Sequence, residues 1–75
     1  MYVLFNAQHQ ILIEEEDLLT QKKIYYFASP AKVKAVNSYS NKTAKIKRFF
    51  SPKSFPNYYW QKDNRVLRKQ IRDNY

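Results

Sequence analysis

The sequence predicts a small α+β domain, in which a twisted antiparallel sheet or partly open barrel of four to five strands is closed by a C-terminal helix. Three observations predict this class. Short runs of β-branched and aromatic residues dominate the first third of the chain, lysine alternates with apolar residues in the middle, and apolar residues recur at helical spacing near the end. With 75 residues, we expect a single domain, 1–75, with a thin core.

The first strands are predicted from apolar runs separated by polar residues. Residues 2–5 and 11–13 are rich in β-branched and aromatic side chains, and the polar stretch 6–10 between them predicts a β-hairpin. Residues 23–28 form a third strand candidate of the same composition. The acidic and polar segment 14–22 either extends the second strand or makes a turn of helix, because acids are favoured at a helix N-terminus.

The middle of the chain contains two alternating segments, residues 32–36 and 43–49, separated by a turn-rich stretch. We favour a second hairpin, in which the inward side chains are Val33, Ala35, Ala44 and Ile46 and the outward ones are Lys32, Lys34, Lys45 and Lys47. The alternative is a pair of short helices, since Ser29 followed by Pro30 resembles a helix start.

A loop and a helix are predicted for the last quarter. Serines and prolines break regular structure over residues 51–57, where Phe55 is expected to anchor the loop. The helix should begin between Asn57 and Asp63, either of which can cap it. Its apolar stripe contains Trp60, Leu67, Ile71 and Tyr75, and a second stripe contains Arg65, Arg68, Lys69 and Arg72.

The chain contains no glycine, so other residues must make the turns. We expect asparagine and aspartate at left-handed backbone positions and His9 as a polar turn residue. Without glycine there is no Walker A loop and no dinucleotide-binding fingerprint. Phosphates would therefore be contacted by lysine and arginine side chains.

Charge is segregated along the chain. Residues 18–62 contain ten lysines and arginines and no carboxylate in 45 positions, whereas four of the six acids stand together at 14–17. The net charge is +8 and the sequence pI is about 9.8. A strongly basic surface indicates a polyanionic partner, nucleic acid first, although excess lysine also serves solubility alone.

Enzymatic chemistry has little support in the sequence. There is one histidine and no cysteine, so a Cys-His pair and disulfides are excluded. For the acidic run 14–17, a contact with the basic surface is favoured over a metal site. We therefore expect no cofactor and no metal. The apolar runs are too short to span a bilayer, which predicts a soluble, cytoplasmic protein with no membrane partner.

Aromatic residues are interleaved with the cations, as in proteins that stack bases on rings while cations follow the backbone. Core positions are favoured for Phe5, Phe27, Phe49 and Trp60, whereas Tyr39 and Tyr58 are expected to be exposed. The candidate nucleic-acid-binding residues are Lys32, Lys34, Tyr39, Lys45, Lys47, Arg48, Tyr58, Arg65, Arg68, Lys69 and Arg72.

The leading hypothesis is a non-enzymatic nucleic-acid-binding protein, with the choice between DNA and RNA left open. The alternative is a small phage or mobile-element accessory protein, for example an inhibitor of defence, that docks on a larger host protein that processes nucleic acid. In that case the acidic run 14–17 could mimic phosphates. A homodimer remains open in both cases.

Overall fold

Six antiparallel strands and two helices make up the part of the chain that the computed structural model describes, residues 1–52 and 58–73. The elements are β1 (Tyr2–Phe5), β2 (Ile11–Asp17), β3 (Lys23–Ala28), α1 (Ala31–Asn37), β4 (Lys42–Ile46), β5 (Arg48–Phe49), β6 (Tyr59–Lys62) and α2 (Arg65–Asp73). This confirms the predicted α+β class with an antiparallel sheet and a C-terminal helix. The number of strands is six rather than four or five.

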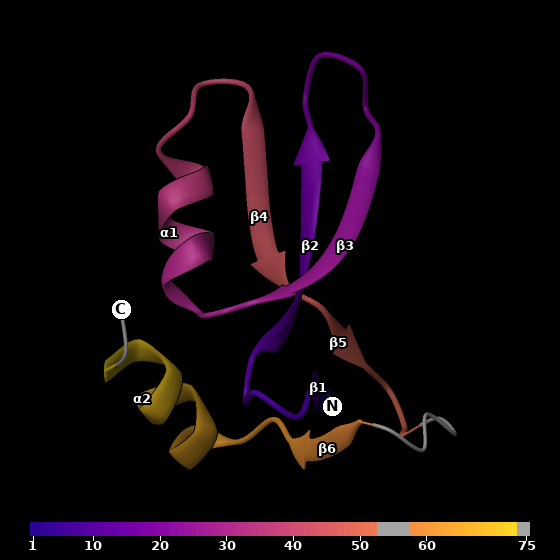
Figure 1. Ribbon diagram of the computed structural model, residues 1–75, viewed down its shortest axis with the longest axis vertical. Helices are drawn as coiled ribbons and strands as arrows, with labels where there is room; N and C mark the ends of the chain where they lie inside the picture. The colour runs from indigo at the N-terminus through magenta and orange to yellow at the C-terminus, as the bar shows by residue number, and fades with distance from the viewer. Residues whose placement is uncertain (53–57, 74–75) are drawn as a thin grey trace.

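The sheet is open and consists of two three-stranded parts, with a bend between them (Figure 1). In one part β2 lies between β3 and β4, and in the other β1 lies between β5 and β6. The parts are joined where Phe5 of β1 pairs with Ile11 of β2, and where the backbone N–H of Lys47 donates to the carbonyl of Leu12 at 3.0 Å. β4 therefore belongs to the part that contains β2, and β5 belongs to the part that contains β1.

The first three strands are confirmed. β1 and β2 pair antiparallel as a hairpin, and β3 has the predicted bounds. The ambiguous segment 14–22 is resolved as strand and turn, because β2 continues through Asp17 and pairs on both sides, with β3 and with β4. Pairing on both edges gives this acidic stretch more backbone hydrogen bonds than an isolated turn of helix would.

The turns are built differently from the prediction. Asn6 Oδ1 accepts hydrogen bonds from the N–H groups of Gln8 and Gln10, and Asp17 Oδ1 accepts from those of Leu19 and Thr20. Among the described residues, however, the left-handed positions fall on His9 (φ 59°) and Gln21 (φ 61°). The expectation that asparagine and aspartate occupy them was wrong, because their side chains act as acceptors at the start of each turn. His9 is an exposed turn residue as predicted.

The predicted strand at 32–36 is wrong, since this segment is helix α1. Pro30 has φ −57°, and the N–H groups of Lys32 and Val33 bond to the carbonyls of Ser29 and Pro30 in the first turn. Helical spacing then turns Val33 and Val36 to the core and leaves Ala35 exposed. The second segment, 43–49, is extended as predicted, but its partner is β2.

The predicted start of the last helix is also wrong. Trp60 lies in β6, which pairs with β1 in the register Leu4 to Trp60. α2 begins at Arg65, one residue after Asn64, whose Oδ1 accepts the N–H of Leu67 at 2.9 Å. This is an N-cap hydrogen bond from a residue outside the predicted interval of candidates. The loop anchor Phe55 and the stripe residue Tyr75 lie outside the described residues.

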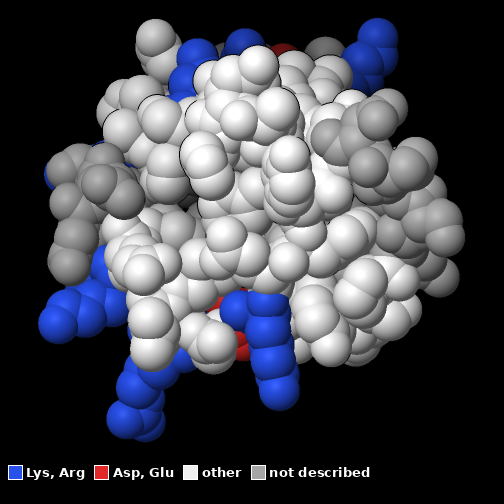
Figure 2. Space-filling view, turned by 60° about the horizontal axis from the view of Figure 1, so that its bottom comes forward, with Lys and Arg blue, Asp and Glu red and all other residues white. Residues whose placement is uncertain are grey.

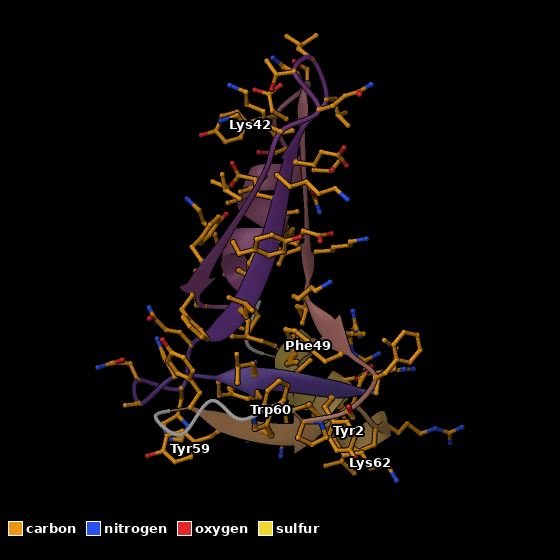
Figure 3. All side chains as sticks on the ribbon, turned by 90° about the vertical axis from the view of Figure 1, so that its right-hand side faces the viewer. Tyr2, Lys42, Phe49, Tyr59, Trp60 and Lys62 are labelled. Atoms are coloured by element: carbon orange, nitrogen blue, oxygen red, sulfur yellow. The ribbon has the colours of Figure 1, made fainter. Side chains whose placement is uncertain are left out.

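One core joins both parts of the sheet, and both helices pack on the same face of it (Figure 1). Leu67 and Ile71 are buried as predicted, together with residues of β1, β2, α1 and β4. The cluster contains Val3, Phe5, Ile11, Ile13, Val36, Ala44, Ile46, Leu67 and Ile71. The other face carries its own aromatic contacts, among them Phe49 packed edge to face against Trp60 at 5.1 Å (Figure 3).

Candidate nucleic-acid interface

The cationic stripe of α2 is positioned by the burial of the opposite side of the helix. Leu67 and Ile71 are 5% and 8% exposed and pack into the core. The residues on the opposite side of the helix must then face outward. The outward set is Arg65, Arg68, Lys69 and Arg72, and all four side chains are exposed. The predicted stripe is therefore present on the surface.

These four side chains line a shallow groove of about 460 Å³. Among the described side chains, no residue of the groove lining is acidic, and none is apolar. In the described parts of the chain, no ion pair involves Arg65, Lys69 or Arg72. Three of the four cations are thus available to an external anion without breaking a contact between described residues.

Arg68 is held by a carboxylate next to the groove. Its Nε and Nη2 donate to the two oxygens of Asp63 at 3.2 and 3.3 Å, and Nε of Arg48 donates to the same carboxylate at 2.7 Å. The Asp63 side chain is only 3% exposed. The hydrogen bond from Arg68, with help from Arg48, outweighs the effect of burial and holds the pKa of Asp63 below its ordinary value. The carboxylate stays ionised and fixes both guanidinium groups.

Lys32 and Lys34 lie on α1, on the same side of the sheet as α2 (Figure 1). Both are exposed, and the helix keeps them outside the core because Val33 and Val36 occupy its buried side. They add positive charge to the helical side of the molecule. In the described ranges, the groove of α2 is nevertheless lined by residues of α2 alone.

Lys45 and Lys47 lie on the opposite, helix-free face. Lys45 Nζ is 3.2 Å from Glu14 Oε2, and Lys47 Nζ lies 5.9 and 5.6 Å from the ring centroids of Tyr25 and Phe49. Both cations are therefore engaged within the sheet, one in an ion pair and one in cation–π contacts. The predicted set is divided between two faces and does not form one continuous surface.

Of the two tyrosines in the predicted set, Tyr39 is 66% exposed in the turn after α1. Tyr58 is 39% exposed and packs against Phe27 with ring centroids 5.0 Å apart. The core prediction holds for Phe5, while Phe27, Phe49 and Trp60 are half-buried. Tyr39 is thus the more accessible ring for stacking.

The molecule also has a largely uncharged face. Viewed from below β6 and α2, it shows lysine and arginine mainly at its margins, around a broad white centre (Figure 2). Tyr59 of β6 is 59% exposed and Val66 of α2 is 66% exposed. The charge is therefore unevenly distributed over the surface.

The acidic run is engaged by cross-strand neighbours. Glu14 pairs with Lys45 and accepts from the Tyr25 hydroxyl at 3.0 Å, and Glu15 pairs with Lys42 and accepts from Tyr26 at 2.5 Å. The expected contact between the acidic run and basic residues is present, and it is formed by residues of the same chain. Lys42 and the two tyrosines are residues that sequence reasoning missed, since their roles follow only from the register of β2 with β3 and β4.

Asp63 is the other residue that sequence reasoning missed. The sequence indicated Asp63 as a candidate cap of the last helix, yet its carboxylate binds Arg68 five positions later and Arg48 fifteen positions earlier. Residue spacing indicates neither contact, because helix neighbours lie three or four positions apart, Asp63 precedes α2, and Arg48 lies on β5.

Within the described ranges, no group of three or more potential metal ligands comes together. The helices found there are also too short or too polar to cross a bilayer. Comparison with protein-family models, with curated protein sequences and with solved structures finds no match for this chain.

Proposed function

We propose that this chain is a non-enzymatic nucleic-acid-binding protein that contacts phosphates mainly through α2. The observation that carries the proposal is the groove whose described lining residues are Arg65, Arg68, Lys69 and Arg72. Four like charges on adjacent turns repel one another, and a polyanion relieves this repulsion as it displaces counterions. The net charge of +8 favours the same class of partner at long range.

The proposal narrows the predicted set of contact residues. Lys32, Lys34 and Tyr39 extend the helical side and are secondary phosphate or base contacts. Lys45, Lys47 and Tyr58 already have partners on the helix-free face. Arg48 contributes through the carboxylate that it shares with Arg68. Binding to DNA and to RNA is proposed equally, because phosphate contacts do not separate them.

The test compares two double variants with the same net charge. Arg65→Gln with Lys69→Gln removes two groove cations that form no described ion pair, and Lys22→Gln with Lys23→Gln removes two exposed cations near the β2–β3 turn. Affinity for a labelled oligonucleotide is measured at about 50 mM salt, where even weak electrostatic association is detected.

We expect the groove variant to bind at least tenfold more weakly than the control variant, a difference of about 1.4 kcal/mol. Equal affinities would show that binding is a general effect of net charge. The absence of binding by the wild-type protein to both DNA and RNA would remove the proposed function altogether.

The second candidate is the accessory protein that docks on a larger host protein. It is favoured by the largely uncharged face seen in Figure 2, since the centres of protein–protein interfaces are depleted of charged residues. A pull-down with and without nuclease separates the two candidates. A protein partner retained after nuclease, with no affinity for free nucleic acid, supports docking.

A further inference from the structure

A pocket next to the groove brings together arginines from two elements. It lies between the β4–β5 segment and α2 and has a volume of about 140 Å³. Its lining consists of Ile46, Arg48, Arg68, Ile71 and Arg72. This is roughly ten times the space that one water molecule requires, so a tetrahedral anion fits.

Two of the three guanidinium groups of this pocket, those of Arg48 and Arg68, are held in place before any ligand arrives. Asp63 accepts one hydrogen bond from Arg48 and two from Arg68, and Arg48 Nη1 lies 3.4 Å from the carbonyl of Ile46. A guanidinium group has five N–H donors, so each arginine keeps donors that these contacts do not use. The side chains of Arg48 and Arg68 are 35% and 66% exposed, which leaves those donors accessible.

The local charge favours an anion. Among the described side chains, the pocket has three arginines and one neighbouring carboxylate, which is 3% exposed behind the two guanidinium groups that it binds. A phosphate oxygen can then approach the arginines from the solvent side without meeting Asp63. Planar guanidinium groups bind phosphate with paired hydrogen bonds when their orientation is fixed.

We propose that Arg48, Arg68 and Arg72 bind one phosphate group of the nucleic acid, and that Asp63 is a positioning residue for this pocket. The inference rests on the proposed function, because it assigns one phosphate of the bound strand to one place. It goes beyond a cationic surface in one respect. The affinity must depend on the orientation of the arginines as well as on their charge.

Removing the negative charge of Asp63 distinguishes orientation from charge. Asp63→Asn and Glu16→Gln both raise the net charge from +8 to +9, since one of the six acids is lost in each. Simple attraction therefore predicts equal or tighter binding by both variants. Glu16 lies on β2 and does not line the arginine pocket, so it is the matched control.

We expect Asp63→Asn to bind a labelled oligonucleotide about tenfold more weakly than Glu16→Gln, because the arginines lose a charge-assisted partner. Equal or tighter binding by a folded Asp63→Asn protein would overturn the proposal that this pocket binds a phosphate. Wild-type protein that binds no oligonucleotide would instead remove the proposed function, so the two failures are distinguishable. Circular dichroism and thermal melting establish whether each variant is folded.

A second pair of variants decides the matter if Asp63→Asn does not fold. Arg72→Lys and Lys22→Arg both keep the net charge, but only Arg72 lines the pocket, and Lys22 is an exposed residue outside both the pocket and the groove. We expect a several-fold loss of affinity for Arg72→Lys and no change for Lys22→Arg. Equal affinities would contradict the inference.

Inorganic phosphate tests whether the pocket instead serves a free anion. At constant ionic strength, we expect phosphate to raise the melting temperature of the protein much less than the oligonucleotide does. A rise as large as that with the oligonucleotide, abolished by Arg72→Lys, would assign the pocket to free phosphate and overturn its role in strand binding.

Discussion

At the scale of single residues, the acids of this basic protein act as organisers of its cations and tyrosines. Glu14 joins Lys45 and Tyr25, Glu15 joins Lys42 and Tyr26, and Asp63 joins two arginines. Each of these carboxylates is largely buried beneath its partners, with Asp63 the most extreme at 3% exposure. Few acids are present, and these three are used inside the fold.

Burial by itself would raise the pKa of Glu14, but hydrogen bonds from Lys45 and Tyr25 outweigh it and the pKa is lowered. The stability that this provides is complete above the ordinary value of about 4.5 and is lost as the pH falls through the lower value of the folded protein. We therefore expect the free energy of unfolding to decrease below pH 4.5. Glu14→Gln should flatten this decrease in denaturant titrations, and an unchanged pH profile would contradict the assignment.

The pKa of Tyr26 is shifted in the opposite direction, and this shift affects stability at high pH. Burial, with the hydrogen bond to Glu15, raises its pKa to about 12. Stability is then present below the ordinary value of 10 and is lost as the pH rises through 12. A spectrophotometric titration of tyrosinate should show a late component that Tyr26→Phe removes. If the variant keeps that component, another tyrosine is responsible.

At the scale of elements, the side chain of Asn37 joins α1 to β4 by two hydrogen bonds. Asn37 Oδ1 accepts the N–H of Ala44 at 2.7 Å, and its Nδ2 donates to the carbonyl of Ala44 at 3.1 Å. Ala44 lies in the outer strand of its part of the sheet, where backbone groups have no further strand partner among the described residues. The side-chain amide of Asn37 thus satisfies the backbone N–H and carbonyl that a neighbouring strand would otherwise bind, and it fixes the position of α1.

Asn37→Ala should lower the free energy of unfolding by about 1 to 3 kcal/mol, since two partly buried hydrogen bonds to the backbone are lost. Chemical denaturation measures this effect, and Gln8→Ala in the exposed first turn serves as the control. A loss no larger than that of the control would mean that α1 is held by the packing of Val33 and Val36 alone.

The same element shows why part of the fold was not predictable from the sequence. Residues 32–36 satisfy both an alternating and a helical pattern. The helix is favoured by tertiary contacts, because it places Val33 and Val36 together on the side that packs against the core. Trp60 fits the stripe of α2 by spacing, but pairing with β1 places it in a strand. The strands 2–5 and 23–28 were predictable from their β-branched and aromatic residues, and the stripe of α2 was predictable from its helical spacing.

At the scale of the whole molecule, the two faces of the sheet have different roles. Both helices cover one face and present their cations outward, whereas the other face uses Lys45 and Lys47 to cover Glu14 and aromatic rings. The sequence could predict the cations of the candidate site but not this division. It depends on which side of each strand faces the helices, and hence on the register of β2, β4 and β5.

The slope of the logarithm of affinity against the logarithm of salt concentration tests the central claim most directly, because it counts the cations that neutralise phosphates. We measure it for the wild-type protein and for the variant with Arg65, Arg68, Lys69 and Arg72 changed to glutamine. With duplex DNA, the slope should become less steep by about 1 for each groove cation removed. An identical slope in the two proteins, or no binding by the wild type, would contradict a phosphate-binding role for α2.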